Sequence, residues 1–144
     1  MKIVPTISSD STGPLGVAHL PRFWQKVVLA EKNLLSAGYD FCGQGYDQMV
    51  LDGLGLDREE TLAFLKTIPS YFAFEKWILA RKGGKLDAAA VEKLNAAIRG
   101  YHHTEHVRKS ILAAGGIDDK EGRFLDAVNL NNFDDWTEFH ASLK

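Results

Sequence analysis

Apolar side chains recur every three or four residues along most of the chain, which is the spacing of one face of an α-helix. After Pro21, the residues at this spacing are Phe23, Val27, Ala30 and Leu34. No segment alternates apolar and polar residues for long enough to predict a β-strand. The pattern therefore predicts an all-α fold.

Residues that start and stop helices divide this pattern into about seven short-to-medium helices. Asp57 with Glu60, and Asp118 with Glu121, have the spacing of a capping box, which marks the start of a helix. Glycine and proline mark the ends of helices. The expected helices run from Pro21 to Gly38, around Met49 to Leu54, from Asp57 to Pro69, from Ser70 to Gly83, from Asp87 to Gly115, from Asp118 to Val128 and from Asn132 to Leu143.

These helices are expected to pack around one core, because a chain of 144 residues has the size of one domain. The three tryptophans fall on apolar helix faces and are predicted to be core residues. The last of them, Trp136, is followed at helical spacing by Phe139 and Leu143. We therefore expect these three side chains to lie on one apolar face of the last helix.

Residues 1–19 differ from the rest of the chain in being rich in Ser, Thr, Gly and Pro. They show no apolar periodicity between Ser8 and Gly16, which predicts a flexible or extended N-terminal arm. The remaining residues, 20–144, are expected to form the single helical domain.

Composition and charge argue against several classes of protein. The net charge is −2 and no basic patch is present, which argues against nucleic-acid binding. No apolar run approaches the roughly 20 residues of a membrane span. Cys42 is the only cysteine, which suits a reducing compartment, and the apolar run before Pro5 is too short for a signal peptide. These features predict a cytoplasmic protein.

Three of the five histidines lie between His102 and His106, and this cluster suggests a metal site. On a continuous helix His102 and His106 would share one face, as zinc ligation requires, and Glu105 could act as general base. A catalytic zinc needs a third protein ligand, for which Glu121, Glu138 and His140 are the downstream candidates. A metal-dependent hydrolase is thus one hypothesis, with zinc or another divalent metal as cofactor. Solvated histidines are the alternative.

No other complete catalytic or cofactor signature is present. The glycines at Gly43 and Gly45 begin like a dinucleotide-binding fingerprint, but Gln48 stands where the third glycine belongs. The sequence contains neither a phosphate-binding G-K-[ST] loop nor a G-x-S-x-G nucleophile elbow. These absences favour a non-catalytic binding or interaction domain over an enzyme.

A series of positions between the first expected helix and Trp77 resembles a known family. They are His19-Leu20-Pro21-Arg22, then Lys26, Gly38-Tyr39, Asp47, the Gly55-Leu56-Asp57 turn and Trp77. This arrangement resembles a bacterial family called domain of unknown function 5069, over about residues 14–80. Beyond Trp77 the resemblance is weaker, although Asp126 and the helix at Asp135-Trp136 are similar to the family's closing segment. The resemblance implies a small helical protein and no established activity.

Among the positions that carry this resemblance, Arg22, Lys26, Tyr39 and Asp47 are polar and are the candidate ligand-binding residues. Arginine and lysine bind carboxylate or phosphate groups, so these residues could form a small-anion or metabolite pocket. The alternative is that Arg22 or Lys26 pairs with Asp47 and locks two helices together. Homodimerisation is plausible for a bacterial protein of this size, and a small-molecule or protein partner is the other possibility.

Overall fold

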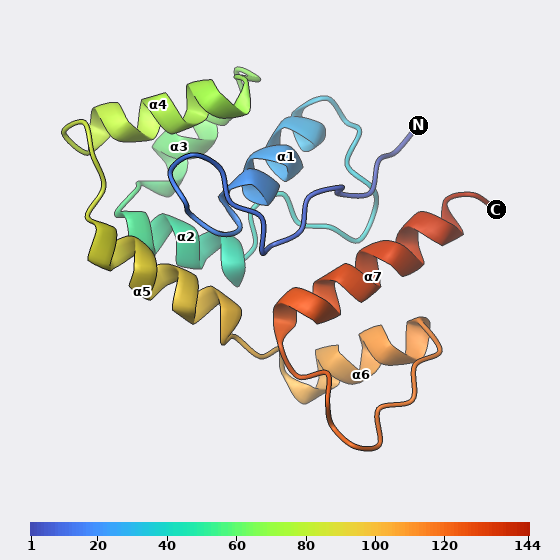
Figure 1. The fold of residues 1–144 in the computed structure, drawn as a ribbon. Coiled ribbons are helices and arrows are strands. Elements are labelled where there is room, and N and C mark those ends of the chain that lie inside the picture. Colours follow the sequence, from blue (N-terminus) through green and yellow to red (C-terminus); the bar gives the residue numbers. More distant parts are fainter.

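The computed structural model describes residues 1–144 and contains seven α-helices, which confirms the all-α prediction (Figure 1). The helices are α1 (Leu20–Glu31), α2 (Tyr46–Leu54), α3 (Arg58–Leu65), α4 (Tyr71–Arg81), α5 (Ala88–Arg99), α6 (Glu105–Ala114) and α7 (Ala127–Ala141). Only two isolated β-bridges occur, between Ile3 and Leu35 and between His102 and Asp126. None of the seven helices combines the length and apolar character that a membrane span requires.

Helix α1 lies at the centre of the molecule, because it packs against α2, α3 and α4. Helix α5 covers α2, and α6 and α7 lie side by side as a pair next to this five-helix group (Figure 1). The core is formed by apolar side chains of these helices; the largest fully buried ones include Leu20, Phe23, Leu51, Leu65, Phe74 and Ile78.

The predicted helix starts at Asp57, Ser70 and Asp87 are confirmed. Each side chain accepts a hydrogen bond from a backbone N–H of the first turn, at 2.9, 3.1 and 3.2 Å respectively. These bonds satisfy donors that have no partner within the helix. The side chain of Glu60 pairs with Arg81 on α4 and so ties α3 to α4.

The first helix is shorter than predicted, because it ends at Glu31 and not at Gly38. Asn33 adopts a left-handed conformation with φ of 55°, which stops the helix. The chain after Asn33 pairs with the N-terminal segment, where the N–H of Ile3 donates to the carbonyl oxygen of Leu34 at 2.6 Å. The backbone groups beyond Asn33 are therefore used in a tertiary contact.

The long helical segment predicted from Asp87 to Gly115 forms two helices, and Gly100 is the C-cap of the first. Helix α5 ends at Arg99, and the side chain of Thr104 caps α6 by accepting a hydrogen bond from the N–H of Val107 at 3.3 Å. Between them, the carbonyl oxygen of Tyr101 accepts a hydrogen bond from the N–H of Ala127 at 2.8 Å. Through this hydrogen bond, the link between α5 and α6 is attached to the start of α7.

The helix predicted from Asp118 to Val128 is absent. The carboxylate of Asp119 accepts the N–H groups of Arg123 and Phe124 and pairs with Arg108, so it holds this segment as a loop against α6. The cap of the last helix is Asp126, and α7 continues through the predicted turn at Asn131-Asn132.

Residues 1–19 contain no helix and lie against α1 and α5. Val17 and Ala18 are completely buried, and so is the polar residue Ser9. The side chain of Asn95 on α5 holds this segment by bonding the N–H of Ala18 at 2.9 Å and the carbonyl oxygen of Gly16 at 2.7 Å. The N-terminal segment is therefore part of the packed structure.

The assignment of Asp126 as the N-terminal cap of α7 can be tested by mutation. Asp126→Ala removes the acceptor of the Asn129 N–H, which is 2.9 Å away, and should lower the free energy of unfolding by about 1 kcal/mol. Asp118→Ala is the matched control, because Asp118 is exposed and caps no helix. Urea denaturation monitored by circular dichroism measures both; an equal loss in the Asp118 variant would contradict the assignment.

Candidate functional site

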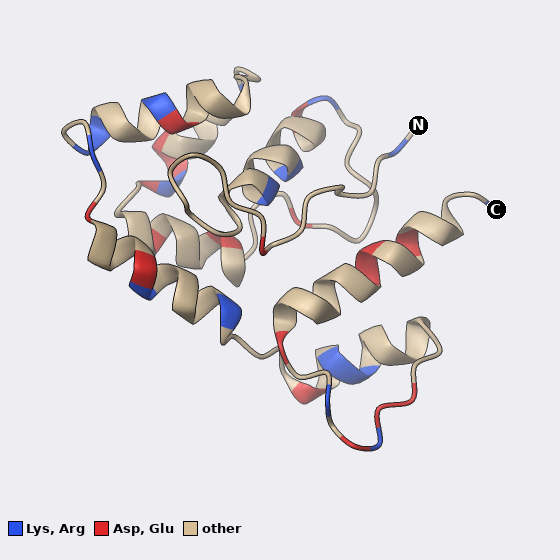
Figure 2. Ribbon diagram, viewed as in Figure 1, with Lys and Arg blue, Asp and Glu red and all other residues tan.

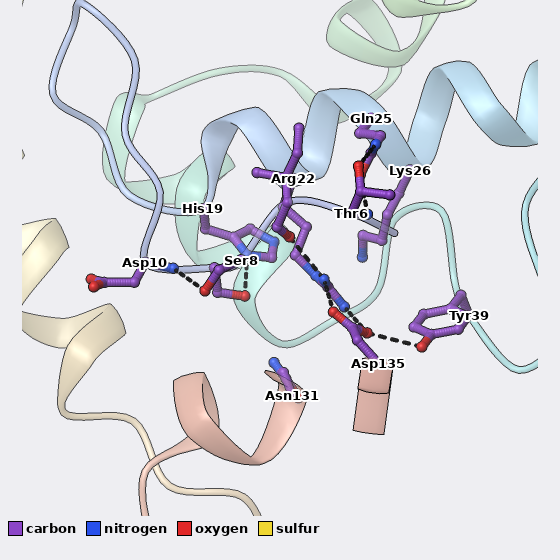
Figure 3. Close-up of polar contacts among 12 residues, drawn as sticks. Thr6, Ser8, Asp10, His19, Arg22, Gln25, Lys26, Tyr39, Asn131 and Asp135 are labelled. Atoms are coloured by element: carbon purple, nitrogen blue, oxygen red, sulfur yellow. Dashed lines mark hydrogen bonds and ion pairs between the residues drawn. The ribbon is translucent and has the colours of Figure 1, made fainter. Parts of the chain in front are cut away.

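A buried ion pair connects α1 to α7. The guanidinium of Arg22 donates to both carboxylate oxygens of Asp135, at 2.6 and 3.0 Å, and also to the carbonyl oxygen of Ile7 at 2.9 Å. The hydroxyl of Tyr39 donates to the same carboxylate at 2.9 Å (Figure 3). The N-terminal segment, α1, the segment after α1 and α7 therefore meet at this one carboxylate.

A second buried cluster lies one helical turn further along α1. The ammonium of Lys26 donates to Asp47 at 2.6 Å and to the carbonyl oxygen of Asp40 at 3.0 Å. His19 contacts the other oxygen of Asp47 through Nε2 at 2.6 Å, and its Nδ1 lies 3.0 Å from the hydroxyl of Ser9. Helices α1 and α2 are thus joined through charged and polar groups as well as through the core.

Burial and the neighbouring groups together determine the charge states in this second cluster. Complete burial lowers the pKa of His19 below its usual value of 6.5, although the neighbouring Asp47 acts in the opposite direction. Burial alone would raise the pKa of Asp47, but the hydrogen bond from His19 and the Lys26 ammonium hold it below 3.8. At neutral pH a neutral His19 therefore donates from Nε2 to an ionised Asp47 and accepts from Ser9.

The structure brings the four candidate ligand-binding residues into these two clusters. Lys26 pairs with Asp47, while Arg22 and Tyr39 converge on Asp135. No buried side-chain nitrogen or oxygen in the chain lacks a hydrogen-bond partner. Because both cations are neutralised by buried carboxylates, the geometry favours the helix-locking role over an anion pocket.

Ser9, His19 and Asp47 form a hydrogen-bonded series of the residue types found in serine hydrolases. Ser9 is completely buried, and His19 and Asp47 are nearly so. A nucleophile must be reached by the carbonyl carbon that it attacks, whereas Ser9 is closed off from solvent. This series therefore holds the N-terminal segment against α1 and α2.

The histidine cluster does not have the geometry that the metal hypothesis requires. His102 lies in the link between α5 and α6, whereas His106 lies in the first turn of α6, so they do not share a helix. Glu105 pairs with Arg108 at 2.8 Å, and His103 bonds Asn131 of α7 at 2.8 Å. Nowhere in the chain do three His, Cys, Asp or Glu side chains gather in a way that could hold a metal ion.

The first turn of α7 buries apolar side chains, Ala127, Val128 and Leu130, whereas its second half buries a carboxylate and exposes aromatic side chains. Asp135 is buried, and the partly buried Asp134 has a raised pKa because of burial and the nearby carboxylates of Glu138 and Asp135. Figure 2 shows acidic positions along the middle of α7 and basic positions on α1. The predicted core position of Trp136 is wrong, because 64% of this residue is exposed.

Trp136 and Phe139 of α7 are exposed, and so is Leu143 in the turn just after the helix; we call these three residues the α7 stripe. Phe139 is 58% and Leu143 is 67% exposed. Trp136 lies about 100° from Asp135 around the helix, and Phe139 lies about 60° from Trp136 and about 40° from Asp135. The exposure of Trp136 and Phe139 therefore follows from the way α7 packs and not from the position of Asp135 alone.

A groove lies on each side of Trp136. One, of about 320 Å³, is lined mainly by the N-terminal segment and α7, including Pro5, Ile7, Asn132 and Phe139. The other, of about 430 Å³, lies between α6 and α7 and is lined by residues that include Ile117 and His140. The indole ring of Trp136 therefore forms a ridge between two concave, partly apolar surfaces.

The α7 stripe and its two grooves are the candidate functional site. Sequence reasoning missed this site because apolar spacing alone indicates a face and not the direction in which it points. No family model, curated protein or solved structure matches the chain. The site is therefore interpreted from its own geometry.

The Arg22–Asp135 pair can be tested by removing either charge. Asp135→Asn or Arg22→Met leaves the other charge buried without its partner, which should lower the free energy of unfolding by about 3 to 5 kcal/mol. The double variant Arg22→Met with Asp135→Leu should lose much less than the sum of the two single losses. Urea denaturation measures all three; single losses under about 1 kcal/mol, typical of an exposed pair, would contradict the assignment.

The second cluster predicts a specific dependence of stability on pH. The folded protein binds a proton at His19 less readily than the unfolded chain, so lowering the pH below about 6.5 favours unfolding. The contribution is complete above that pH and decreases by up to about 1.4 kcal/mol per pH unit below it. Urea denaturation between pH 7.5 and 5 should show this slope, and His19→Gln should reduce it. The same reduction in the exposed control His106→Gln would count against His19.

Proposed function

We propose that this chain is a non-catalytic interaction domain that binds a protein partner through the α7 stripe. The observation that carries this proposal is the second half of α7, in which Asp135 is buried while Trp136 and Phe139 face solvent. An amphipathic helix on a protein surface normally buries its apolar side. The reverse arrangement is expected where a partner covers that side.

The chemistry of the α7 stripe supports a macromolecular partner. Its three side chains together expose on the order of 400 Å² of mostly apolar surface, which is the size of the functional patches found on monomeric proteins. Tryptophan is among the residues that contribute most to binding energy in protein interfaces. The concave surface on each side of Trp136 offers places for partner side chains to insert.

The two other hypotheses have less support. The small-anion or metabolite pocket would have to use Arg22 and Lys26, whose charges are already paired with buried carboxylates. The metal-dependent hydrolase would have to bring His102 and His106 together from different elements. Membership of the resembled family and a cytoplasmic location stay predictions from the sequence.

A comparison of captured proteins tests the proposal. The tagged chain should retain the same protein from an extract of its source cells in repeated experiments, with further copies of the chain counted as partners. Trp136→Ser combined with Phe139→Ser should remove that protein, because both substitutions delete exposed apolar area without touching the core. Phe72→Ser on α4 is the matched control, since Phe72 is 62% exposed and lies on another helix. Capture that is equal for all three proteins, or absent for all, would contradict the proposal.

A further inference from the structure

We infer that a pocket between the N-terminal segment, α1 and α4 binds a small molecule through a quaternary ammonium group. This pocket shares no residue with the α7 stripe, so the inference is independent of the proposed function. Two observations carry it. Aromatic rings wall the pocket, and the buried carboxylate of Glu75 behind them has no cationic partner.

The pocket has a volume of about 490 Å³, which is the size of a site for a small molecule. Its walls include the rings of Trp24, Tyr71 and Phe72. The ring of Tyr71 stands nearly perpendicular to the other two, at 73° to Trp24 and 72° to Phe72, with ring centroids 5.8 Å apart in both pairs. A group that sits in the angle between two such rings contacts an aromatic face on each side.

The carboxylate of Glu75 lies directly behind the pocket wall. Gly13 lines the pocket, and a Cβ atom added to it would stand 2.5 Å from the ring of Tyr71 and 2.6 Å from Oε2 of Glu75. The same oxygen accepts hydrogen bonds from the hydroxyl of Tyr71 at 2.6 Å and from the N–H of Leu15 at 3.3 Å. Gly13 and Tyr71 therefore connect the pocket to this carboxylate.

Glu75 differs from the other two buried acidic residues, because it has no counter-charge. The carboxylates of Asp47 and Asp135 pair with basic side chains of α1. No lysine, arginine or histidine pairs with Glu75, which is only 5% exposed. A carboxylate that is taken out of water without a counter-charge is unfavourable, and a cation in the adjacent pocket would supply that charge.

The hydrogen bond from Tyr71 to this carboxylate also favours a cation in the pocket. Burial and the neighbouring Glu75 raise the pKa of the Tyr71 hydroxyl, so this group stays protonated and donates. An anionic acceptor polarises the phenol and increases the negative charge on the face of its ring. Cations bind to that face of an aromatic ring.

The chemistry of the lining selects a quaternary ammonium group among the possible occupants. No basic side chain lines the pocket, and Glu75 would repel an anion. A neutral ligand would leave that carboxylate without a counter-charge. A primary ammonium is strongly hydrated and needs hydrogen-bond acceptors, which an almost entirely apolar lining does not replace. A quaternary ammonium group donates no hydrogen bond and binds aromatic faces directly.

Titration of the wild-type chain with choline, followed by heteronuclear NMR at constant ionic strength, is the test. The signals of the Trp24 indole N–H and the Gly13 amide report on the pocket and should shift along a saturable curve in the millimolar range or below. The second probe is the carbon analogue of choline, in which a tert-butyl group replaces the trimethylammonium group. This neutral analogue has the same shape and should bind about tenfold more weakly, because it lacks the charge.

The variant Glu75→Gln removes the charge and keeps an oxygen that can accept both hydrogen bonds. Its affinity for choline should decrease about tenfold, whereas its affinity for the carbon analogue should not change. Glu59→Gln is the matched control, because Glu59 is exposed on α3 and lines no part of this pocket. This control should bind choline like the wild type.

Three results would overturn the inference. The first is the absence of a saturable shift at the Trp24 and Gly13 signals with choline far above the millimolar range. The second is equal binding of choline and its carbon analogue to the wild-type chain, which holds as a test even if Glu75→Gln alters the fold. The third is tighter binding of a peptide with trimethyl-lysine than of choline, which would assign the pocket to a protein side chain.

Discussion

The buried ion pair between Arg22 and Asp135 is the constraint on which the arrangement of this molecule depends. A carboxylate that is taken out of water must find a counter-charge, and Asp135 finds it on the central helix α1, 113 residues away in the sequence. This requirement sets the rotation of α7 about its own axis. Trp136 is rotated by about 100° from Asp135 around the helix, and with Asp135 buried it lies in solvent.

Helix α1 combines two kinds of contact with its neighbours. Its apolar residues, such as Phe23 and Val27, form the core, while Arg22 and Lys26 pair with carboxylates from α7 and α2. Apolar contacts tolerate small shifts of one helix past another, whereas a two-point guanidinium–carboxylate contact fixes direction as well as distance. We interpret the two buried clusters as the features that select one arrangement of the helices among several compact alternatives.

The parts of the fold that depend on local chemistry could be predicted from the sequence. The caps at Asp57, Ser70 and Asp87 act within three residues, and the helical spacing of apolar residues indicates the all-α class. The number of helices agrees only because two errors cancel: one predicted helix is two, and another is absent. The contacts that define the site are of a different kind. Nothing local marks Asp135 as the partner of Arg22, and the loop organised by Asp119 replaces a predicted helix through a contact with Arg108. Periodicity could locate the apolar positions Trp136 and Phe139, but their exposure depends on tertiary packing that no local signal shows.

The most direct test of the central claim is hydroxyl-radical footprinting of the wild-type chain in dilute solution, where association through the α7 stripe is negligible. If Asp135 turns the polar side of α7 inward, Trp136 and Phe139 should be oxidised much faster than the buried Phe74. Trp24, whose indole N–H donates to the carbonyl oxygen of Pro69 at 2.9 Å, provides a partly buried internal reference for the same side chain. Oxidation of Trp136 as slow as that of Phe74 would show that the apolar side of α7 faces the core, and would contradict the account.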